Sequence, residues 1–445
     1  MTQPEPSAGA AQRIAAGYAF DGAALRLGAV VHDGVCDPRA QVRIPLAMLN
    51  RHGLIAGATG TGKTRTLQLL AEQLSEHGVA VLAADVKGDL SGLALPGAPD
   101  ERVTQRSTEV GDDWTPTAYP TEFFTLGDGS GIPLRATMTS FGPVLLSKVL
   151  GLNETQESAL GLIFHWADRA GLPLLDVKDL RSVVTFLTGD GKPALKTLGG
   201  VSTATAGVIL RKLSGLENEG GDVFFGEPEF DTADLLRTAP DGRGVISCLE
   251  LAGQARNPEL FSTFLMWVLA DLFEFLPELG DTDKPKLVFF LDEAHLLFTG
   301  ASKAFLEAVT QTVRLIRSKG VGVFFVTQNP TDLPSEVLGQ LGNRIQHGLR
   351  AFTPEDADAL RKTVRTYPMT ADYDLSTALT SLGIGEAVVT VLSERGAPTP
   401  VAWTMLRPPT SLMAELDPAV QTQIVAASEL KDDYSETIDR ESAYE

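Results

Sequence analysis

One short stretch of this sequence carries residue types that bind a nucleoside triphosphate. Consecutive residues match the pattern G-x-x-x-x-G-K-[ST], with Arg65 directly after them: Gly57, Ala58, Thr59, Gly60, Thr61, Gly62, Lys63 and Thr64. The glycines let the backbone curl so that its N–H groups point at phosphate oxygens, and the dipole of a following helix adds to this attraction. We expect Lys63 to neutralise the β- and γ-phosphates and Thr64 to bind Mg²⁺. Residues 57–65 are therefore predicted to bind ATP and Mg²⁺.

Two neighbouring carboxylates follow a second apolar stretch. Residues 287–291 are all apolar, which predicts a buried strand, and Asp292 and Glu293 come directly after it. Ligands of α/β proteins bind at the carboxyl ends of strands, so we expect Asp292 to hold Mg²⁺. Glu293 would then activate the attacking water as a general base. An acidic helix cap at a strand end is the plain alternative; together with the phosphate-binding loop, the pair favours hydrolysis over phosphate transfer to a small molecule.

Three more side chains are candidates for the γ-phosphate end of the site. Gln328 follows the apolar residues 321–326 and would sense the γ-phosphate or orient the water, although strand ends often carry simple turn formers. Arg344 and Arg350 flank a strand-like segment, 345–349. In ring ATPases an arginine of one subunit stabilises the transition state in its neighbour. Either arginine is a candidate for this role, and an ordinary surface arginine is the alternative.

These side chains need a sheet that brings several strand ends to one edge. From Gly53 onward, short apolar runs alternate with helical patterns, such as the one over 63–76. This alternation predicts an α/β fold of the P-loop NTPase type (RecA/ASCE-like) with a mostly parallel sheet. Asp85 and Lys87 follow another apolar run and would lie at the same edge, and a charged exit from a strand explains them equally well.

Changes in composition divide the chain into five predicted segments. Residues 1–46 predict a short β-rich N-terminal segment, and 47–99 predict the first part of the ATPase core. A mostly helical insertion is expected over 100–240. The second part of the core follows over 241–406, and 407–445 form a C-terminal acidic tail.

Charge and hydropathy limit the partners and the location. The chain has 445 residues and a formal net charge of −20. An acidic surface repels nucleic acid at long range, so a DNA contact would need a local basic patch or a pore built by several subunits. The longest apolar stretch, 260–276, contains Asp271 and Glu274 and predicts a buried helix, not a membrane span. The two cysteines, Cys36 and Cys248, show no metal-binding spacing, and a cytoplasmic location is expected.

Together these motifs resemble the HerA-FtsK superfamily of ring ATPases. The matching features are His52, the Gly57–Thr64 loop, the run Asp85–Asp89, the pair Asp292-Glu293, the pair Thr327-Gln328, and the segment 338–350 with its Asn-Arg pair and second arginine. Longer phrases, including 151–156 and 219–228, resemble bacterial HerA-like proteins of the YjgR type.

The resemblance implies an ATPase that binds ATP and Mg²⁺ and works as a homo-oligomeric ring, with a hexamer expected. Arg344 or Arg350 would be the arginine finger given to a neighbour, and Gln328 would contact the γ-phosphate. The resemblance also implies helicase-like or translocase-like work on DNA. Residues 1–46 cannot build the complete N-terminal barrel of HerA, and no membrane span is expected. Whether a nuclease or another protein is a partner stays open.

Different classes of function remain compatible with the sequence. A DNA motor would use basic residues of the insertion to line a pore: Lys192, Lys196, Arg211 and Lys212. The alternative is an ATP-driven assembly or partner-binding switch without DNA translocation, which the acidic charge and the lack of a recognisable DNA-reading domain favour. A phosphotransferase is a weaker third interpretation, because no acceptor pocket signature is visible.

Overall fold

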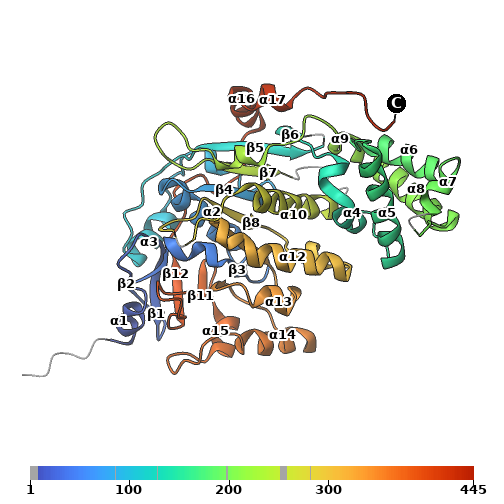
Figure 1. Cartoon of the computed structure of the whole chain (residues 1–445). Coiled ribbons are helices and arrows are strands. Elements are labelled where there is room, and N and C mark those ends of the chain that lie inside the picture. The colour runs from blue at the N-terminus through green and yellow to red at the C-terminus, as the bar shows by residue number, and fades with distance from the viewer. Residues whose placement is uncertain are drawn as a thin grey trace, which may run out of the picture.

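A single 12-stranded sheet forms the centre of the molecule (Figure 1). In this computed structural model the described residues are 9–85, 87–127, 129–196, 199–250, 258–280 and 282–444. The strands, in the order in which they lie side by side, are β2 (Val35–Pro45), β1 (Ala24–His32), β12 (Ala402–Leu406), β11 (Glu386–Thr390), β10 (Asn343–Gln346), β3 (Gly53–Ala56), β9 (Val321–Thr327), β8 (Leu287–Leu291), β4 (Ala80–Asp85), β7 (Ile246–Glu250), β5 (Thr121–Leu126) and β6 (Ile132–Leu134).

The way in which neighbouring strands pair changes once along this sheet. From β10 to β6 every neighbouring pair is parallel, whereas β2, β1, β12, β11 and β10 pair antiparallel. The parallel strands β3, β8 and β9 consist of fully buried residues, as expected for a sheet covered on both faces. The prediction of an α/β fold with a mostly parallel sheet is confirmed.

Helices surround the sheet, and a group of them lies beyond one end of it. The α-helices are α1 (Ala10–Ala16), α2 (Lys63–Glu76), α3 (Glu101–Val110), α4 (Met138–Val149), α5 (Glu154–Ala170), α6 (Val177–Thr188), α7 (Lys192–Lys196), α8 (Thr203–Asn218), α9 (Gly221–Phe224), α10 (Pro258–Phe275), α11 (His295–Phe298), α12 (Lys303–Ile316), α13 (Ser335–Leu338), α14 (Pro354–Val364), α15 (Leu375–Ser381), α16 (Pro418–Ala427) and α17 (Lys431–Tyr434). Short 3-10 helices are η1 (Leu46–Arg51), η2 (Ser91–Ala94), η3 (Thr232–Leu236), η4 (Arg317–Lys319) and η5 (Pro330–Asp332). Among the described helices, none is long and apolar enough to span a membrane.

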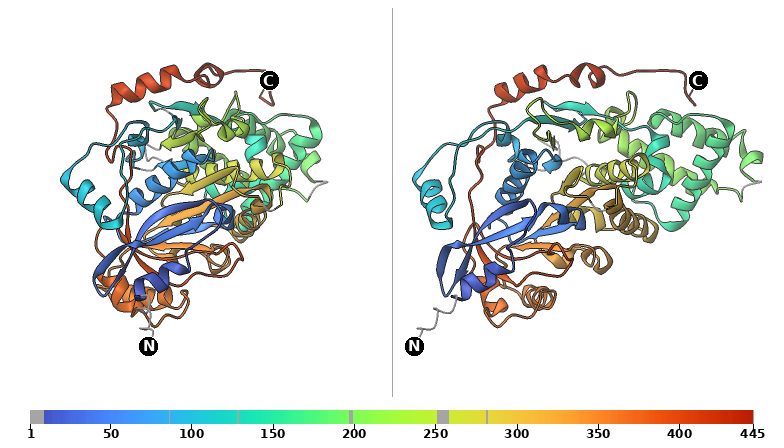
Figure 2. Two further views of the ribbon diagram at one scale, coloured as in Figure 1. Left: turned by 90° about the vertical axis from the view of Figure 1, so that its left-hand side faces the viewer. Right: turned by 60° about the vertical axis from the view of Figure 1, so that its left-hand side comes forward.

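The stretch 100–240 contains both helices and strands. Helices α4 to α9 gather at the end of the molecule far from β1 and β2 (Figures 1 and 2). The same stretch also supplies β5 and β6, which lengthen the central sheet beside β7. These two strands were not expected from the sequence. The helical group therefore begins only at Met138, after the chain has completed one edge of the sheet.

The C-terminal segment connects distant parts of the molecule. After β12 the chain passes α2, where the buried carboxylate of Glu72 accepts hydrogen bonds from the backbone N–H groups of Thr410 and Ser411, each at 2.9 Å. Helices α16 and α17 then run along β5 and β6 (Figure 2). Beyond them, the backbone N–H of Tyr444 donates to Asp179 of α6 at 2.9 Å. The predicted acidic tail is thus packed against both the core and the helical group.

A buried histidine joins the phosphate-loop strand to its neighbours. His52 Nε2 lies 2.7 Å from the Val313 carbonyl, and the backbone N–H of Val323 donates to His52 Nδ1 at 3.0 Å. These partners fix a neutral ring that carries its proton on Nε2. Burial, the largest cause, lowers the pKa of His52 to about 4. The residue that the resemblance singled out just before β3 therefore ties α12 to β9.

We expect the folded chain to lose stability as the pH falls from about 6.5 to about 4, because the unfolded chain binds a proton on His52 that the folded chain excludes. Over this window one proton corresponds to about 3 kcal/mol of unfolding free energy, and the loss levels off below it. Urea unfolding at a series of pH values measures the slope. In the His52→Gln variant the unfolding free energy should depend less steeply on pH, whereas His165→Gln, at an exposed position, should behave like the wild type. Equal slopes for all three proteins would show that His52 does not cause the pH dependence.

Candidate active site

The glycine-rich loop lies between a buried strand and a long helix, as predicted. Strand β3 ends at Ala56, and α2 begins at Lys63. Gly57 has a φ of 154°, and a Cβ atom there would lie 2.5 Å from the Cβ of His347. Gly62, with a φ of 114°, would place a Cβ 3.3 Å from the backbone nitrogen of Gly385. The loop can therefore follow this path only with glycine at both positions.

Three neighbouring segments hold the loop in place. The backbone N–H of Gly57 donates to the Thr327 carbonyl at the end of β9, at 3.2 Å. The N–H of Ala58 donates to the Gly348 carbonyl beyond β10, at 2.8 Å. The N–H of Gly385, just before β11, donates to the Thr61 carbonyl at 3.1 Å. The loop is therefore braced by three segments that lie distant from it in the chain.

Lys63 lies across the loop from which it emerges. Its Nζ donates to the carbonyls of Gly57 at 2.7 Å and Ala58 at 3.2 Å. Burial and the neighbouring Lys87 ammonium lower the pKa of Lys63, and the carboxylates of Asp292 and Glu293 act against this shift. The loop lysine and the two carboxylates thus share one end of the sheet. Such an arrangement is required if they are to hold one nucleotide.

Asp292 and Glu293 stand at the carboxyl end of β8. Burial, followed by the adjacent Glu293 charge, raises the pKa of Asp292 to about 6, although Glu293 donates its backbone N–H to Asp292 Oδ1 at 2.9 Å. Glu293 has a φ of 48°, a left-handed conformation that is uncommon for a residue with a side chain. Strain of this kind occurs often at functional sites. The backbone therefore turns sharply directly after Asp292.

The loop after β4 is built on a buried carboxylate. Asp85 accepts hydrogen bonds from the backbone N–H groups of Lys87 at 3.1 Å, Gly88 at 2.7 Å and Leu90 at 2.8 Å. Burial raises the pKa of Asp85 to about 6, and these hydrogen bonds oppose the rise. Asp85 therefore shapes the loop that carries Lys87. Val86, within the run matched by the resemblance, lies outside the described residues.

The residues present fit a magnesium ion bound together with a nucleotide. Thr64 in the first turn of α2 and Asp292 at the end of β8 would supply a hydroxyl and a carboxylate oxygen. Within the described ranges, no group of three or more His, Cys, Asp or Glu side chains forms a metal site by itself. Mg²⁺ commonly takes one or two protein ligands and completes its shell with water and substrate phosphates. An oxygen-only pair of ligands of this kind suits Mg²⁺.

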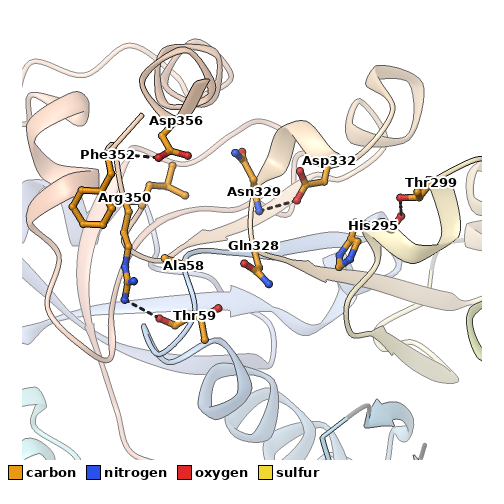
Figure 3. A pocket seen from close by; sticks show the side chains of 11 residues that line it. Ala58, Thr59, His295, Thr299, Gln328, Asn329, Asp332, Arg350, Phe352 and Asp356 are labelled. Carbon is orange, nitrogen blue, oxygen red and sulfur yellow. Dashed lines mark hydrogen bonds between the residues drawn. The ribbon is translucent and has the colours of Figure 1, made fainter. Parts of the chain in front are cut away.

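A cavity of about 610 Å³ opens beside the loop (Figure 3). Gln328, which follows β9, and His295 line it together with Ala58 and Thr59 of the loop. Arg350 reaches into the same cavity, and its Nη2 donates to the Thr59 carbonyl at 3.4 Å. The structure thus brings Gln328 and Arg350 to the loop.

The two candidate arginines occupy different surroundings. Arg344, on β10, donates to the backbone carbonyls of Thr366 at 3.0 Å and of Leu341 and Leu338 at 3.4 Å. It is half-buried, and burial lowers its pKa. Arg350 is exposed and lies at the nucleotide loop of its own chain. Of the two, the structure brings only Arg350 to the candidate site.

Two further residues frame the loop. Arg65 donates to Gln68 at 2.8 Å and to the Met413 carbonyl of the C-terminal segment at 2.9 Å, so its guanidinium faces that segment. His347 is fully buried behind the loop, and its Nε2 lies 2.8 Å from Thr66 Oγ1. His347 was not among the residues expected at the site. It lies within the predicted strand-like segment 345–349, directly after the observed end of β10 at Gln346.

Comparisons with known proteins point to one protein family. A family model described as "Helicase HerA-like C-terminal" matches residues 32–445. The DNA double-strand break repair helicase HerA of Sulfolobus acidocaldarius is 22% identical over 398 residues, which cover 87% of this chain and 72% of the relative. HerA of Saccharolobus solfataricus is also 22% identical, over 84% of this chain and 67% of its own length.

Solved structures show the same fold at low sequence identity. The plasmid coupling protein TrwB in complex with an ATP analogue is 17% identical, with a TM-score of 0.58, over 92% of this chain and 94% of TrwB. VirB4 of Thermoanaerobacter pseudethanolicus is 15% identical, with a TM-score of 0.55, over 87% of this chain and 96% of its own. Because the family model covers nearly the whole sequence, the chain belongs to the helicase HerA-like C-terminal family of P-loop NTPases.

Proposed function

We propose that this chain is a Mg²⁺-dependent ATP hydrolase. One observation carries the proposal. Lys63 and the carboxylates of Asp292 and Glu293 lie at the same end of the sheet, close enough to interact electrostatically. TrwB, with the same fold, has been solved with ADP and Mg²⁺. In this chain the loop 57–64 would bind the phosphates, and Arg65 would support it from α2. Thr64 and Asp292 would hold Mg²⁺, which lowers the charge on the phosphates when bound.

The remaining candidates take roles that follow from their positions. Glu293 accepts a proton from the attacking water, and Gln328, exposed in the cavity beside the loop, orients that water or contacts the γ-phosphate. Arg350 places a positive charge beside the loop, where charge develops on the phosphoryl group. Since it contacts Thr59 of its own chain, we propose that it acts on the nucleotide held by the same chain.

We further propose that the protein is a ring motor acting on DNA. Its relatives named HerA are described as DNA repair helicases, and TrwB as a plasmid coupling protein. A homo-oligomeric ring, with a hexamer expected, would provide the pore that an acidic chain needs to hold DNA. Lys192, Arg211 and Lys212 are exposed on the helical group and are candidates for the pore lining; the side chain of Lys196 lies outside the described part. Membership of the YjgR type and a cytoplasmic location belong to the same proposal.

A nucleotide-driven assembly or partner-binding switch is the second candidate function. The net charge of −20 favours it, because such a surface repels DNA. The deciding experiment is the rate of ATP turnover with and without double-stranded DNA, on protein sized with and without nucleotide. Stimulation by DNA of a ring-sized species supports the motor. ATP turnover that is indifferent to DNA, in a protein that does not bind DNA, would reject the motor and favour the switch.

Removing the side chain of Arg350 should slow turnover more than removing that of Arg344. An arginine that stabilises phosphoryl transfer contributes about a thousandfold or more in kcat. We therefore expect Arg350→Ala to lower kcat by at least about a hundredfold while ATP binding is largely kept. Arg344→Ala should instead lower the melting temperature, because it removes hydrogen bonds to three backbone carbonyls. Phosphate release and thermal unfolding measure the two effects.

Mixing variants shows whether Arg350 acts on the nucleotide of its own chain or on that of a neighbouring subunit. An Arg350→Ala subunit keeps a working loop, and a Lys63→Met subunit keeps a working arginine. If Arg350 acts on its own chain, a mixture of the two stays inactive. Recovery of turnover in mixed rings would contradict this assignment and place the arginine at a neighbouring subunit's nucleotide. An unchanged rate in Arg350→Ala alone would remove the residue from the mechanism.

A further inference from the structure

The loop after β4 brings a second lysine to the carboxylates at the end of β8. Lys87 Nζ lies 3.3 Å from Glu293 Oε1, and His295 Nδ1 lies 3.4 Å from Glu293 Oε2. Each oxygen of the Glu293 carboxylate therefore faces a basic side chain. The ion pair with Lys87 engages Oε1, whereas Oε2 is buried and accepts no hydrogen bond among the described residues. In this conformation Lys87 occupies Oε1, which must be released before that oxygen can accept a hydrogen bond from the attacking water.

The backbone of Lys87 is fixed, whereas its side chain is half exposed. The backbone N–H groups of Lys87 and Gly88 both donate to Asp85 Oδ1. The Gly88 carbonyl in turn accepts a hydrogen bond from the Ser91 hydroxyl at 3.0 Å. The Lys87 side chain is 48% exposed, compared with 14% for the Glu293 side chain. A change of partner at this site therefore needs only new rotamers of Lys87.

Lys87 and Lys63 face the same carboxylates. Each ammonium is attracted by both Asp292 and Glu293, and the two ammonium groups repel each other. Lys63, for its part, rests on carbonyls of its own loop. A triphosphate held in that loop introduces negative charge close to both lysines. The γ-phosphate then competes with Glu293 for Lys87, because the charge of the phosphate is larger than that of one carboxylate.

We propose that Lys87 is a switch for the general base: it pairs with Glu293 until a triphosphate binds and then moves to the γ-phosphate, which frees Glu293. The inference rests on the proposed ATP hydrolysis and adds a regulation to that site. Lys87 acts on the water through Glu293 and is in this sense a positioning residue. A diphosphate lacks the γ-phosphate and leaves the pair intact. Hydrolysis therefore restores the resting pair without any movement of the backbone.

A double-mutant cycle on nucleotide affinity tests the switch without relying on turnover. The four proteins are wild type, Glu293→Gln, Lys87→Met and the double variant, each titrated with a non-hydrolysable ATP analogue plus Mg²⁺ and, separately, with ADP plus Mg²⁺. Glu293→Gln removes the repulsion between carboxylate and phosphate in every background. In proteins that contain Lys87, Glu293→Gln also removes the Lys87–Glu293 ion pair, which otherwise has to break when the analogue binds. The cycle isolates this second effect.

We expect Glu293→Gln to tighten analogue binding by about two- to fivefold more in the presence of Lys87 than in the Lys87→Met background, the size of a partly exposed ion pair. Lys87→Met alone should weaken binding of the analogue and leave ADP binding unchanged, and Lys87→Arg should restore the preference for the analogue. Equal effects of Glu293→Gln in both backgrounds would show that the pair persists and overturn the switch. So would equal losses of analogue and ADP affinity in Lys87→Met. Wild-type protein that binds no analogue would instead reject the proposed ATPase itself.

Discussion

Replacing Glu293 with glutamine should lower ATP turnover by about two to four orders of magnitude while Mg²⁺-ATP still binds. A positioned general base contributes a factor of this size, and an amide cannot accept the proton of the attacking water. The change keeps the shape of the side chain at a position where the backbone has a φ of 48°. It also leaves in place the N–H of residue 293 that donates to Asp292. Single-turnover phosphate release, together with nucleotide titration, separates loss of chemistry from loss of binding.

The matched control for this variant is Glu307→Gln on α12. Glu307 is exposed and pairs only loosely with Lys303, at 3.7 Å. The Glu307→Gln variant changes the net charge by the same amount as Glu293→Gln, at a distance from the loop. It should leave the turnover rate unchanged. Retained turnover in Glu293→Gln would show that another group activates the water. Loss of nucleotide binding in Glu293→Gln would show that the residue holds the site together instead of acting in the chemistry.

Replacing Lys63 with methionine should strongly weaken nucleotide binding. Hydrogen bonds to charged groups contribute roughly 1.5–3 kcal/mol each, so the loss of one phosphate contact raises Kd by at least about tenfold. Methionine has a similar length and no charge. In the chain without nucleotide, Lys63 bonds only to the carbonyls of its own loop among the described hydrogen bonds, so the variant should fold. Titration with a fluorescent ATP analogue measures the effect.

Lys303→Met on α12 is the control for the lost positive charge. The Lys303 side chain is 82% exposed, and we expect its replacement to leave nucleotide affinity unchanged. Thermal unfolding of both variants checks that each is folded. Wild-type affinity in a folded Lys63→Met protein would mean that the glycine-rich loop does not hold the phosphates, and the assignment of residues 57–65 would then be wrong.

The core of this fold could be predicted because its signals are local. The loop pattern stands between a short apolar run and an amphipathic helix, and the structure has β3 and α2 at these places. The run before Asp292 is apolar without alternation, and it forms the fully buried strand β8. The parallel arrangement then follows from alternating strands and helices. The same arrangement places Asp85 and Asp292 at one sheet edge.

Other features depend on contacts between distant segments and could not be predicted from local patterns. Strand β5 follows a stretch rich in proline and polar residues, and it becomes a strand by pairing with β7. The C-terminal segment was predicted only as an acidic tail, whereas its path depends on acceptors such as Glu72. The different surroundings of Arg344 and Arg350 depend on how the segments that follow β10 fold back. Spacing alone leaves the two arginines equivalent.

The proposed chemistry requires that one triphosphate and one Mg²⁺ are held between the loop and the strand-end carboxylates. A crystal structure of the chain with Mg²⁺ and a non-hydrolysable ATP analogue tests this directly. We expect the phosphates within residues 57–64, Lys63 Nζ moved from the Gly57 carbonyl to the phosphates, and the metal between Thr64 and Asp292. A nucleotide bound elsewhere, or a Lys63 that stays on its own loop while the metal lies away from Asp292, would contradict the account.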